Sequence, residues 1–305
     1  MSAAVPPAPP LPTSRVGAWR LAIRPPTLPA SVSPVLVGSA LAVRDEAFAF
    51  LPALAALFCA LALQVAANLA NDVFDFQKGA DRPDRLGPPR VTQLGLLTPR
   101  EVRAGMLVAL AVAMLLGLYL AFVGGWLIVA VGVACIVAAV AYTGGPWPYG
   151  YHALGDAGTF VFFGLVGVVG TYYVQANEFA AAAWWWAIPV GALVTAILVV
   201  NNLRDVDTDR RAGKHTLAVL VGARLTRAWF VSLVGIAYVA AILAWPLGFA
   251  GPGALLALVS LPAAVRPVRA ILAGTSGRAL NLQLKASARL ALAFAVAAAV
   301  GIAVD

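Results

Sequence analysis

Charge is scarce in this chain of 305 residues. Only 11% of the residues are Asp, Glu, Lys or Arg, whereas 62% are hydrophobic and the mean hydropathy is +0.89. A soluble domain carries about a quarter charged residues, so this chain has too few polar side chains to cover a surface exposed to water. The composition excludes a soluble enzyme and a nucleic-acid-binding protein, and it predicts an integral membrane protein.

The chain has only two cysteines. Cys59 and Cys135 both lie inside apolar runs, and their spacing is not that of metal ligands. This excludes a disulfide-stapled secreted module, and we assign both thiols to packing. The first 14 residues are rich in proline and lack the basic start of a secretory signal. We expect a disordered cytoplasmic tail over residues 1–20 and a single membrane domain over residues 21–305.

Apolar runs fill most of the remaining chain, and each is long enough to cross a bilayer as a helix of about 20 residues. The sequence therefore predicts an all-α, multi-pass membrane protein. We expect nine membrane-spanning helices, at residues 28–43, 47–76, 104–122, 125–142, 156–175, 184–203, 226–245, 250–265 and 286–304.

Basic residues are distributed unequally among the predicted loops. Of the 21 Lys and Arg, 20 precede the first helix or fall between helices two and three, six and seven, or eight and nine; only Arg44 lies on the other side. Positively charged loops remain in the cytoplasm, so we predict a cytoplasmic N-terminus and an external C-terminus. Trp184, Trp185 and Trp186 fall at one predicted outer edge, where we expect them to anchor the helix at the lipid interface.

Two predicted helices end on the cytoplasmic side in an amide and two carboxylates at helical spacing, so each set shares one helix face. The sets are Asn68, Asp72 and Asp75 in one helix and Asn201, Asp205 and Asp209 in the other. An Asp facing lipid costs roughly 2.5 to 3.5 kcal/mol, so these side chains must face a cavity or a cation. If the sets converge, a divalent cation removes their repulsion, and Mg²⁺ would complete its shell with water and substrate phosphate.

Basic residues follow each set directly. They are Lys78, Arg82, Arg85 and Arg90 after the first set, and Arg210, Arg211 and Lys214 after the second. These side chains are placed to bind phosphate. The alternative is that both segments are solvated helix ends whose acids pair with nearby arginines. We favour the ligand interpretation for the aspartates, because apolar helices do not need matched stripes of Asn and Asp for stability.

The two motifs resemble those of the UbiA-type intramembrane prenyltransferases, which carry Asn-Asp-x-x-Asp after the second helix and Asp-x-x-x-Asp after the sixth. Segments 24–42, 71–99, 142–156 and 201–219 resemble the menaquinone branch of that family. The resemblance implies nine helices around a central cavity that opens to the lipid. It also implies two Mg²⁺ ions that together hold the diphosphate of a polyprenyl donor.

The resemblance also implies roles for individual residues. The implied catalytic residues are Asp72, Asp75, Asp205 and Asp209, which together with Asn68 and Asp81 are the implied metal ligands. The implied substrate-binding residues are Arg24, Asn68, Asn71, Lys78, Arg82, Tyr142, Asn201, Asn202 and Lys214. Two features depart from the family pattern. Gly79 stands where the generic first motif has a third Asp, and residues 143–203 contain no Lys or Arg, although relatives often carry one after helix four.

By this resemblance, we expect an enzyme of the cell (inner) membrane with its active site toward the cytoplasm. It would transfer a polyprenyl group to 1,4-dihydroxy-2-naphthoate, with loss of CO₂ and diphosphate, to give demethylmenaquinol. The main alternative is another acceptor, such as 4-hydroxybenzoate, homogentisate or a sugar phosphate. A CDP-alcohol phosphotransferase would need one continuous Asp signature, which the sequence lacks. A cation-coupled transporter would place its acids near the midplane, whereas these lie at helix ends.

Overall fold

The computed structural model describes residues 11–79 and 85–305, and every regular element in these residues is helical. The expected all-α fold is therefore confirmed. The helices are α1 (Arg15–Ile23), α2 (Pro29–Arg44), α3 (Phe50–Gln77), α4 (Pro99–Gly124), α5 (Trp126–Ala141), α6 (Gly155–Thr159), α7 (Gly170–Ala176), α8 (Ala181–Arg211), α9 (Leu217–Ala244), α10 (Leu261–Leu272) and α11 (Leu280–Val304). Short 3-10 or π segments extend or join them, namely η1 (Pro25–Thr27), η2 (Tyr149–Tyr151), η3 (Phe160–Val169), η4 (Pro252–Ser260) and η5 (Gly277–Ala279).

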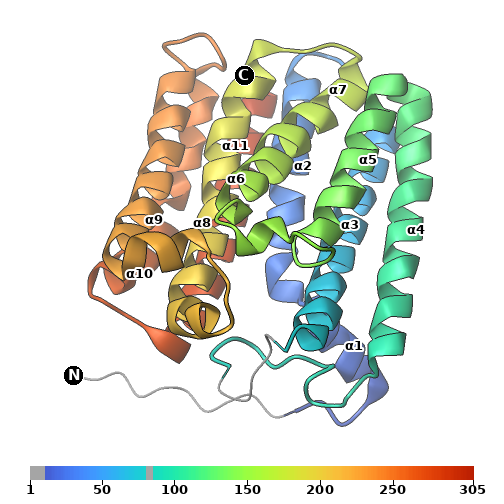
Figure 1. Cartoon of the computed structure of the whole chain (residues 1–305). Coiled ribbons are helices and arrows are strands. Elements are labelled where there is room, and N and C mark those ends of the chain that lie inside the picture. The colour runs from blue at the N-terminus through green and yellow to red at the C-terminus, as the bar shows by residue number, and fades with distance from the viewer. Residues whose placement is uncertain (1–10, 80–84) are drawn as a thin grey trace.

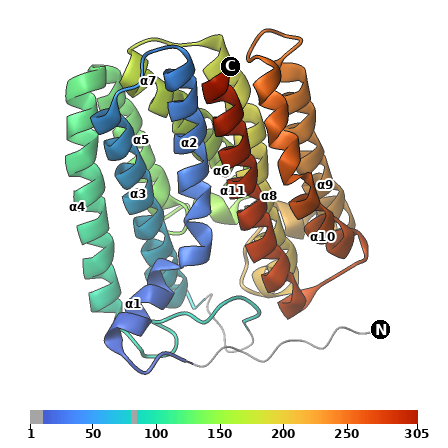
Figure 2. The ribbon, with the colours of Figure 1, turned by 180° about the vertical axis from the view of Figure 1, so that it is seen from behind.

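The long helices stand side by side in one bundle (Figure 1). Helix α3 packs on α4 and α8 packs on α9, as expected for neighbours along the chain. Helices α2 and α11 also pack together, although they come from opposite ends of the sequence (Figure 2). The C-terminus lies at the end of the bundle opposite to α1 and the loop that follows α3.

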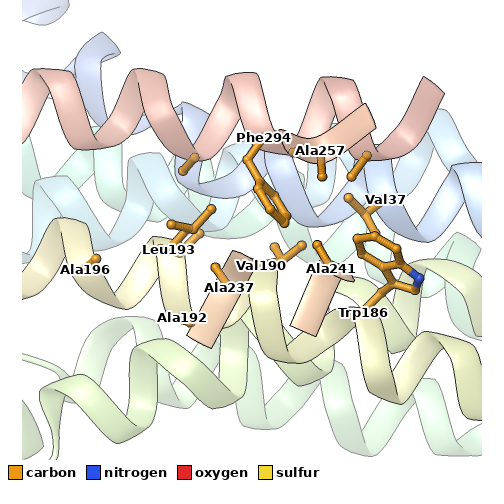
Figure 3. Packing of buried hydrophobic residues seen from close by; sticks show 14 of the residues in the cluster. Val37, Trp186, Val190, Ala192, Leu193, Ala196, Ala237, Ala241, Ala257 and Phe294 are labelled. Carbon is orange, nitrogen blue, oxygen red and sulfur yellow. The ribbon is translucent and has the colours of Figure 1, made fainter. Parts of the chain in front are cut away.

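Helix α8 forms the core of the bundle, and its buried residues extend along most of its length. Figure 3 shows Trp186, Val190 and Leu193 of α8 near the small side chains Ala237 and Ala241 of α9. Small residues allow close helix packing within a membrane, where van der Waals contact replaces the hydrophobic effect as the driving force. Phe294 of α11 lies in the same cluster, so its ring fills space that the alanines leave open.

The expectation for the tryptophan run was wrong at one residue. Trp186 is fully buried in the core and Trp185 donates to the carbonyl of Ala240 at 2.9 Å, whereas Trp184 is 47% exposed. Successive helical residues point about 100° apart because there are 3.6 residues per turn. Three consecutive indoles therefore cannot all face the lipid interface.

Helix α1 begins at Arg15, inside the segment that we expected to be a disordered tail to residue 20. The side chain of Ser14 caps it by accepting from the amide of Gly17 at 3.1 Å, which satisfies one of the free amides of the first turn. The helix ends at Arg24, which has a left-handed conformation (φ 56°) and precedes two prolines. Consequently α1 with η1 meets α2 at a bend of 50°.

Helical segments occur at all nine predicted positions, but the number that span a membrane is a separate question. Seven helices in the described residues are long and apolar enough to do so, or up to eight if the bent pair Arg15–Thr27 and Pro29–Arg44 is one span. Helix α5 has only 16 residues, fewer than the roughly 20 needed to cross a bilayer. Nine spans and a cytoplasmic N-terminus therefore stay predictions.

Gly301 of α11 packs directly against the backbone of Gly253 in η4, and a methyl group there would overlap the carbonyl oxygen of Gly253. We expect Gly301→Val to destabilise the protein by about 1–3 kcal/mol, the usual cost of overpacking. Thermal unfolding in detergent measures the change. The control is Gly235→Ala in α9, which meets nothing within 4 Å. A parental unfolding temperature for Gly301→Val would contradict the close packing of α11 on η4.

Candidate active site

The two acidic segments converge, which is the condition that the metal-site interpretation required. Helices α3 and α8 end at the same end of the bundle, and their polar residues line one cavity of about 410 Å³. Cys59 and Cys135 also line this cavity, so both thiols border open space as well as packing on neighbours. The cavity has a polar end near the loops and an apolar part between the helices. This division suits a ligand that is charged at one end only.

Asp75 lines the polar end of the cavity and is only 2% exposed. Its Oδ2 accepts from Nη2 of Arg90 at 3.0 Å, and its Oδ1 accepts from the hydroxyl of Tyr151 at 2.5 Å and from Nζ of Lys214 at 3.2 Å. Two cations therefore balance a carboxylate that is shielded from bulk water, which would otherwise be costly to bury. Because Arg90 follows α3 and Lys214 follows α8, Asp75 joins both loops.

Asp72 is placed differently from the expectation. It is 1% exposed and does not line the cavity. Its Oδ1 accepts from the amide of Thr92 at 3.1 Å and from the hydroxyl of the same residue, and its Oδ2 accepts from the amide of Val91 at 3.3 Å. The side chain therefore anchors the loop that carries Arg90. The structure brings Asp75 into the cavity, but not Asp72.

Asn68 and Arg24 join α3 to the bend before α2. Nδ2 of Asn68 donates to the carbonyl of Ile23 at 2.9 Å and to the hydroxyl of Thr27 at 3.1 Å, and Nη2 of Arg24 donates to the carbonyl of Asn68 at 3.5 Å. Both side chains line the cavity, and their role in substrate binding stays a prediction.

Asn71 and Lys78 contact the loop that follows α5. Oδ1 of Asn71 accepts from the hydroxyl of Thr143 at 2.8 Å, and Asn71 lines the cavity. Nζ of Lys78 donates to the carbonyls of Thr143 at 2.8 Å and Gly145 at 3.3 Å, and it lies 5.2 Å from the ring centroid of Tyr151. Residues 143–203 contain no Lys or Arg, so the neighbouring helix supplies a cation to this loop.

In the second motif, a buried guanidinium organises the acidic and amide residues. Nε of Arg204 donates to Oδ1 of Asp205 at 2.8 Å, and Nη2 donates to Oδ1 of Asn201 at 2.7 Å. Nη1 donates to Asn281 of α11 at 2.8 Å, and Nδ2 of Asn281 donates to the carbonyl of Leu86 at 2.9 Å. Asp205 and Asn201 still line the cavity, so Arg204 orients them without closing the site.

Asp209 and Asn202 complete the second side of the cavity. The carbonyl of Asp209 accepts from the amide of Lys214 at 2.9 Å, which folds the following loop back toward Asp75. Nδ2 of Asn202 donates at 3.4 Å to Asp156, whose other oxygen accepts from Nε1 of Trp229 at 3.0 Å. Asp156 is a buried carboxylate that the sequence analysis did not single out.

The sequence analysis also missed Tyr151 and Tyr149. Tyr151 donates to Asp75 and carries Nζ of Lys214 at 4.5 Å from its ring centroid. The ring of Tyr149 meets that of Tyr142 edge to face, with 5.3 Å between centroids, and burial raises the pKa of Tyr149 to about 12. Phenols of this kind stay protonated at neutral pH and donate hydrogen bonds. The aromatic run from Tyr142 to Tyr151 was the available signal, but only Tyr142 was selected from it.

The apolar part of the cavity is lined by residues of α3, α4, α5, α8 and the π-helical segment η3. Phe162 and Phe163 of η3 belong to this lining. Two other aromatics are not part of this lining, because Phe76 is exposed at the end of α3 and Tyr172 donates to Asp45 at 2.9 Å. The aromatic wall of the cavity is therefore built mainly from η3 and the loop after α5.

Among the described residues, no group of three or more His, Cys, Asp and Glu side chains is arranged to hold a metal ion alone. The cavity does carry oxygen donors on two sides, Asn71 and Asp75 from α3 and Asp205 and Asp209 from α8. Mg²⁺ often takes one or two carboxylates and completes its shell with water and substrate phosphate. The donors fit an ion that arrives with a diphosphate rather than one in a closed protein cage. Asp81 and Arg82 lie outside the described residues.

Comparison with known proteins agrees with the resemblance to the UbiA-type prenyltransferases. The model of the UbiA prenyltransferase family matches residues 31–281. The chain is 40% identical over 281 residues to the 1,4-dihydroxy-2-naphthoate octaprenyltransferase of Mycobacterium tuberculosis, covering 92% of this chain and 95% of that protein. It is 42% identical over 229 residues to the Escherichia coli protein of the same name, covering 72% and 74%.

Solved structures agree with the fold. A UbiA homologue from Aeropyrum pernix superposes with a TM-score of 0.68 at 17% identity, covering 90% of this chain and 98% of that one. A homologue from Archaeoglobus fulgidus bound to DMAPP and Mg²⁺ superposes with a TM-score of 0.62 at 12% identity, covering 93% and 99%.

The position of Asp72 leads to a test of its loop. Asp72→Asn removes one acceptor oxygen from the amides of Val91 and Thr92, at a cost of about 1–3 kcal/mol for a buried group. We expect hydrogen exchange over residues 90–97 to accelerate about tenfold or more, as measured by mass spectrometry. Asp207→Asn, whose side chain is 82% exposed, serves as the control. Unchanged exchange in Asp72→Asn would show that the loop does not depend on this carboxylate.

Proposed function

Because the chain belongs to the UbiA prenyltransferase family, we propose that it transfers a polyprenyl group from a polyprenyl diphosphate to 1,4-dihydroxy-2-naphthoate. Diphosphate and CO₂ leave, and demethylmenaquinol forms. The observation that carries the proposal is 40% identity, over 92% of the chain, to a 1,4-dihydroxy-2-naphthoate octaprenyltransferase. The cavity supports it, because a donor of this class has a charged head and a long apolar tail.

The diphosphate head would bind at the polar end of the cavity. Asn71 and Asp75 on one side and Asp205 and Asp209 on the other would hold two Mg²⁺ ions. Bound Mg²⁺ would neutralise the diphosphate and stabilise it as a leaving group. The A. fulgidus homologue bound to DMAPP and Mg²⁺ supports a Mg²⁺ requirement. The proposal omits Asp72, because its oxygens are already engaged by the backbone and hydroxyl of the 91–92 loop.

Arg90 and Lys214 would exchange partners when the donor binds. Without donor, both cations contact Asp75. A metal ion on Asp75 would compete for the same carboxylate oxygens, and the two side chains would then donate to phosphate oxygens instead of to Asp75. Charge-assisted hydrogen bonds of this kind are strong and directional. Each charged group of the site would thus keep a partner in both states.

The apolar part of the cavity would hold the reacting end of the prenyl chain. Loss of diphosphate leaves an allylic cation, which needs a pocket that excludes water and presents aromatic faces. Tyr142, Tyr149, Phe162 and Phe163 line the cavity. A volume of about 410 Å³ lies within the range of about 300–1,000 Å³ typical of sites for drug-sized ligands. We therefore expect a long prenyl tail to extend beyond the cavity into the lipid.

Most of the Lys and Arg of the chain lie close in sequence to the acidic ends of α3 and α8, so the positive-inside rule supports an active site that faces the cytoplasm. We place the protein in the cell membrane, with the lipid bilayer as the source of its prenyl donor.

Purified protein in nanodiscs, supplied with a labelled long-chain prenyl diphosphate and Mg²⁺, should convert 1,4-dihydroxy-2-naphthoate to a lipid product and release one CO₂ per turnover. Extraction of the labelled lipid measures the product, and trapping of CO₂ from naphthoate labelled in its carboxylate measures the release. 4-Hydroxybenzoate, offered in parallel, is the control acceptor. Product from 4-hydroxybenzoate alone would refute the proposed acceptor but retain prenyl transfer.

Replacement of Asp75 by Asn should lower kcat/KM by about 100-fold or more, the scale found when a positioned charge-stabilising group is removed. It should also raise the Mg²⁺ concentration needed for half-maximal rate. A titration of the prenyl diphosphate at saturating Mg²⁺ gives kcat/KM, and a titration of rate against Mg²⁺ at saturating substrates gives the Mg²⁺ dependence. The exposed Asp207→Asn serves as the control. An unchanged Mg²⁺ dependence in Asp75→Asn would remove Asp75 from the metal site.

A further inference from the structure

Part of the loop that follows α3 is fixed at both of its ends, and we call this part, residues 85–92, the strap. At one end, the carboxylate of Asp72 in α3 accepts from two strap amides, at 3.1 and 3.3 Å. At the other end, Nδ2 of Asn281 donates to the carbonyl of Leu86 at 2.9 Å. Asn281 lies in the first turn of α11. The strap therefore joins α3 to a helix from the far end of the sequence (Figure 2).

Asn281 is itself held by the second motif. Its Oδ1 accepts from Nη1 of Arg204 at 2.8 Å, and the side chain of Arg204 is only 1% exposed. A guanidinium can only donate hydrogen bonds, so the oxygen of the amide must face Arg204 and its NH₂ group must face Leu86. One side chain of α11 thus connects the strap to the residue that orients Asp205 and Asn201.

Gly87 brings the strap into direct contact with the same guanidinium. A methyl group on Gly87 would lie 2.7 Å from Nη2 and 2.9 Å from Cζ of Arg204. Nη2 of Arg85 lies 3.2 Å from the same point. The guanidinium groups of Arg85 and Arg204 are therefore neighbours across Gly87, and only a residue without a side chain fits between them.

Arg85 is built into the strap and lines the cavity. Its Nε donates to the carbonyl of Pro88 at 3.1 Å, which closes a turn around Gly87. Pro88 and Pro89 have φ fixed near about −65° by their rings. Because this turn is stiff, a displacement at Leu86 or Gly87 moves the guanidinium of Arg85 as well.

We infer that Asn281 is a positioning residue for the diphosphate of the donor. By holding the carbonyl of Leu86, it sets the strap at the height where Arg85 donates to diphosphate oxygens. Asn281 itself touches no substrate. The inference rests on the proposed function, because it assigns Arg85 to the charged head of the donor in that reaction.

The charge of the strap favours the donor over the acceptor as its ligand. Arg90, five residues after Arg85, contacts Asp75, where the metal ions would bind. Both arginines line the cavity, so the strap supplies two guanidinium groups to its polar end. A planar guanidinium matches the oxygens of a phosphate, and such charge-assisted hydrogen bonds depend strongly on geometry.

Asn281→Ala removes the anchor without touching a residue that contacts the donor. We expect the Kd of inorganic diphosphate in the presence of Mg²⁺, measured by titration calorimetry, to rise about tenfold. The KM for the prenyl diphosphate should rise by a similar factor, whereas the acceptor KM should stay within about twofold of the parental value. The matched control is Gln283→Ala, which removes a buried amide of the same helix whose Oε1 has no partner among the described residues. It should leave all three constants unchanged.

Gly87→Ala displaces the strap from its other side. Its methyl group would overlap the guanidinium of Arg204, which three side chains hold in place, so the strap must move instead. We expect the same selective rise in the Kd of diphosphate. Gly235→Ala, where a methyl group meets nothing within 4 Å, is the control.

The Mg²⁺ dependence separates the strap from Arg204. If Asn281 acts through the strap, the Mg²⁺ concentration for half-maximal rate stays at the parental value in both Asn281→Ala and Gly87→Ala. A raised Mg²⁺ requirement in Asn281→Ala alone would show that Asn281 acts through Asp205, and it would overturn the inference. An unchanged Kd of diphosphate in Asn281→Ala, or an equal rise in the acceptor KM, would also overturn it.

Failure of the proposed function gives a different result, because binding of diphosphate requires no acceptor. If the parental protein binds diphosphate with Mg²⁺ but prenylates neither the naphthoate nor 4-hydroxybenzoate, the proposed reaction is wrong. The comparison of Asn281→Ala with Gln283→Ala still tests the strap in that case. Normal prenyl transfer with equal diphosphate binding in the parental protein and both strap variants would overturn the inference alone.

Discussion

Burial of carboxylates at the end of a membrane bundle is the constraint that organises this protein. Asp75 and Asp205 are both almost fully buried, and each is in contact with at least one cation. Removal of one partner from such a pair leaves an uncompensated charge, which is far more costly than loss of an exposed pair. Arg204 pairs with Asp205 from within α8, whereas the loops after α3 and α8 fold onto the helix ends because they carry Arg90 and Lys214, the two cations that contact Asp75.

This requirement also explains how segments far apart in the sequence are joined. Lys214 reaches Asp75 across 139 residues, and Asn281 of α11 links Arg204 to the carbonyl of Leu86. The aromatic loop after α5 takes part through Tyr151, which donates to Asp75 and lies beside the ammonium of Lys214. Four parts of the chain thus meet around two carboxylates, and the site depends on all of them.

Hydropathy predicted the helical segments well, because a run of apolar residues in lipid has few structural alternatives to a helix. Helical spacing also predicted that each acidic set shares one helix face. It did not separate Asp72 from Asp75, since residues four and seven positions after Asn68 share nearly the same face. The difference arises from the 91–92 loop, whose amides bind Asp72. That loop has no periodic pattern, so its contact with α3 was not predictable from spacing.

The same limit applies to Tyr151 and Lys78. Their contacts depend on the conformation of the loop after α5. This loop brings the phenol of Tyr151 to Asp75 and two backbone carbonyls to Lys78. A loop without Lys or Arg first suggested a missing basic contact, whereas Lys78 of the preceding motif supplies the charge from the neighbouring helix end. A loop that has no basic residue can therefore be contacted by a basic side chain from an element packed against it. In this bundle, the apolar helices determine which segments meet, and the balance of charge determines how the loops between them fold.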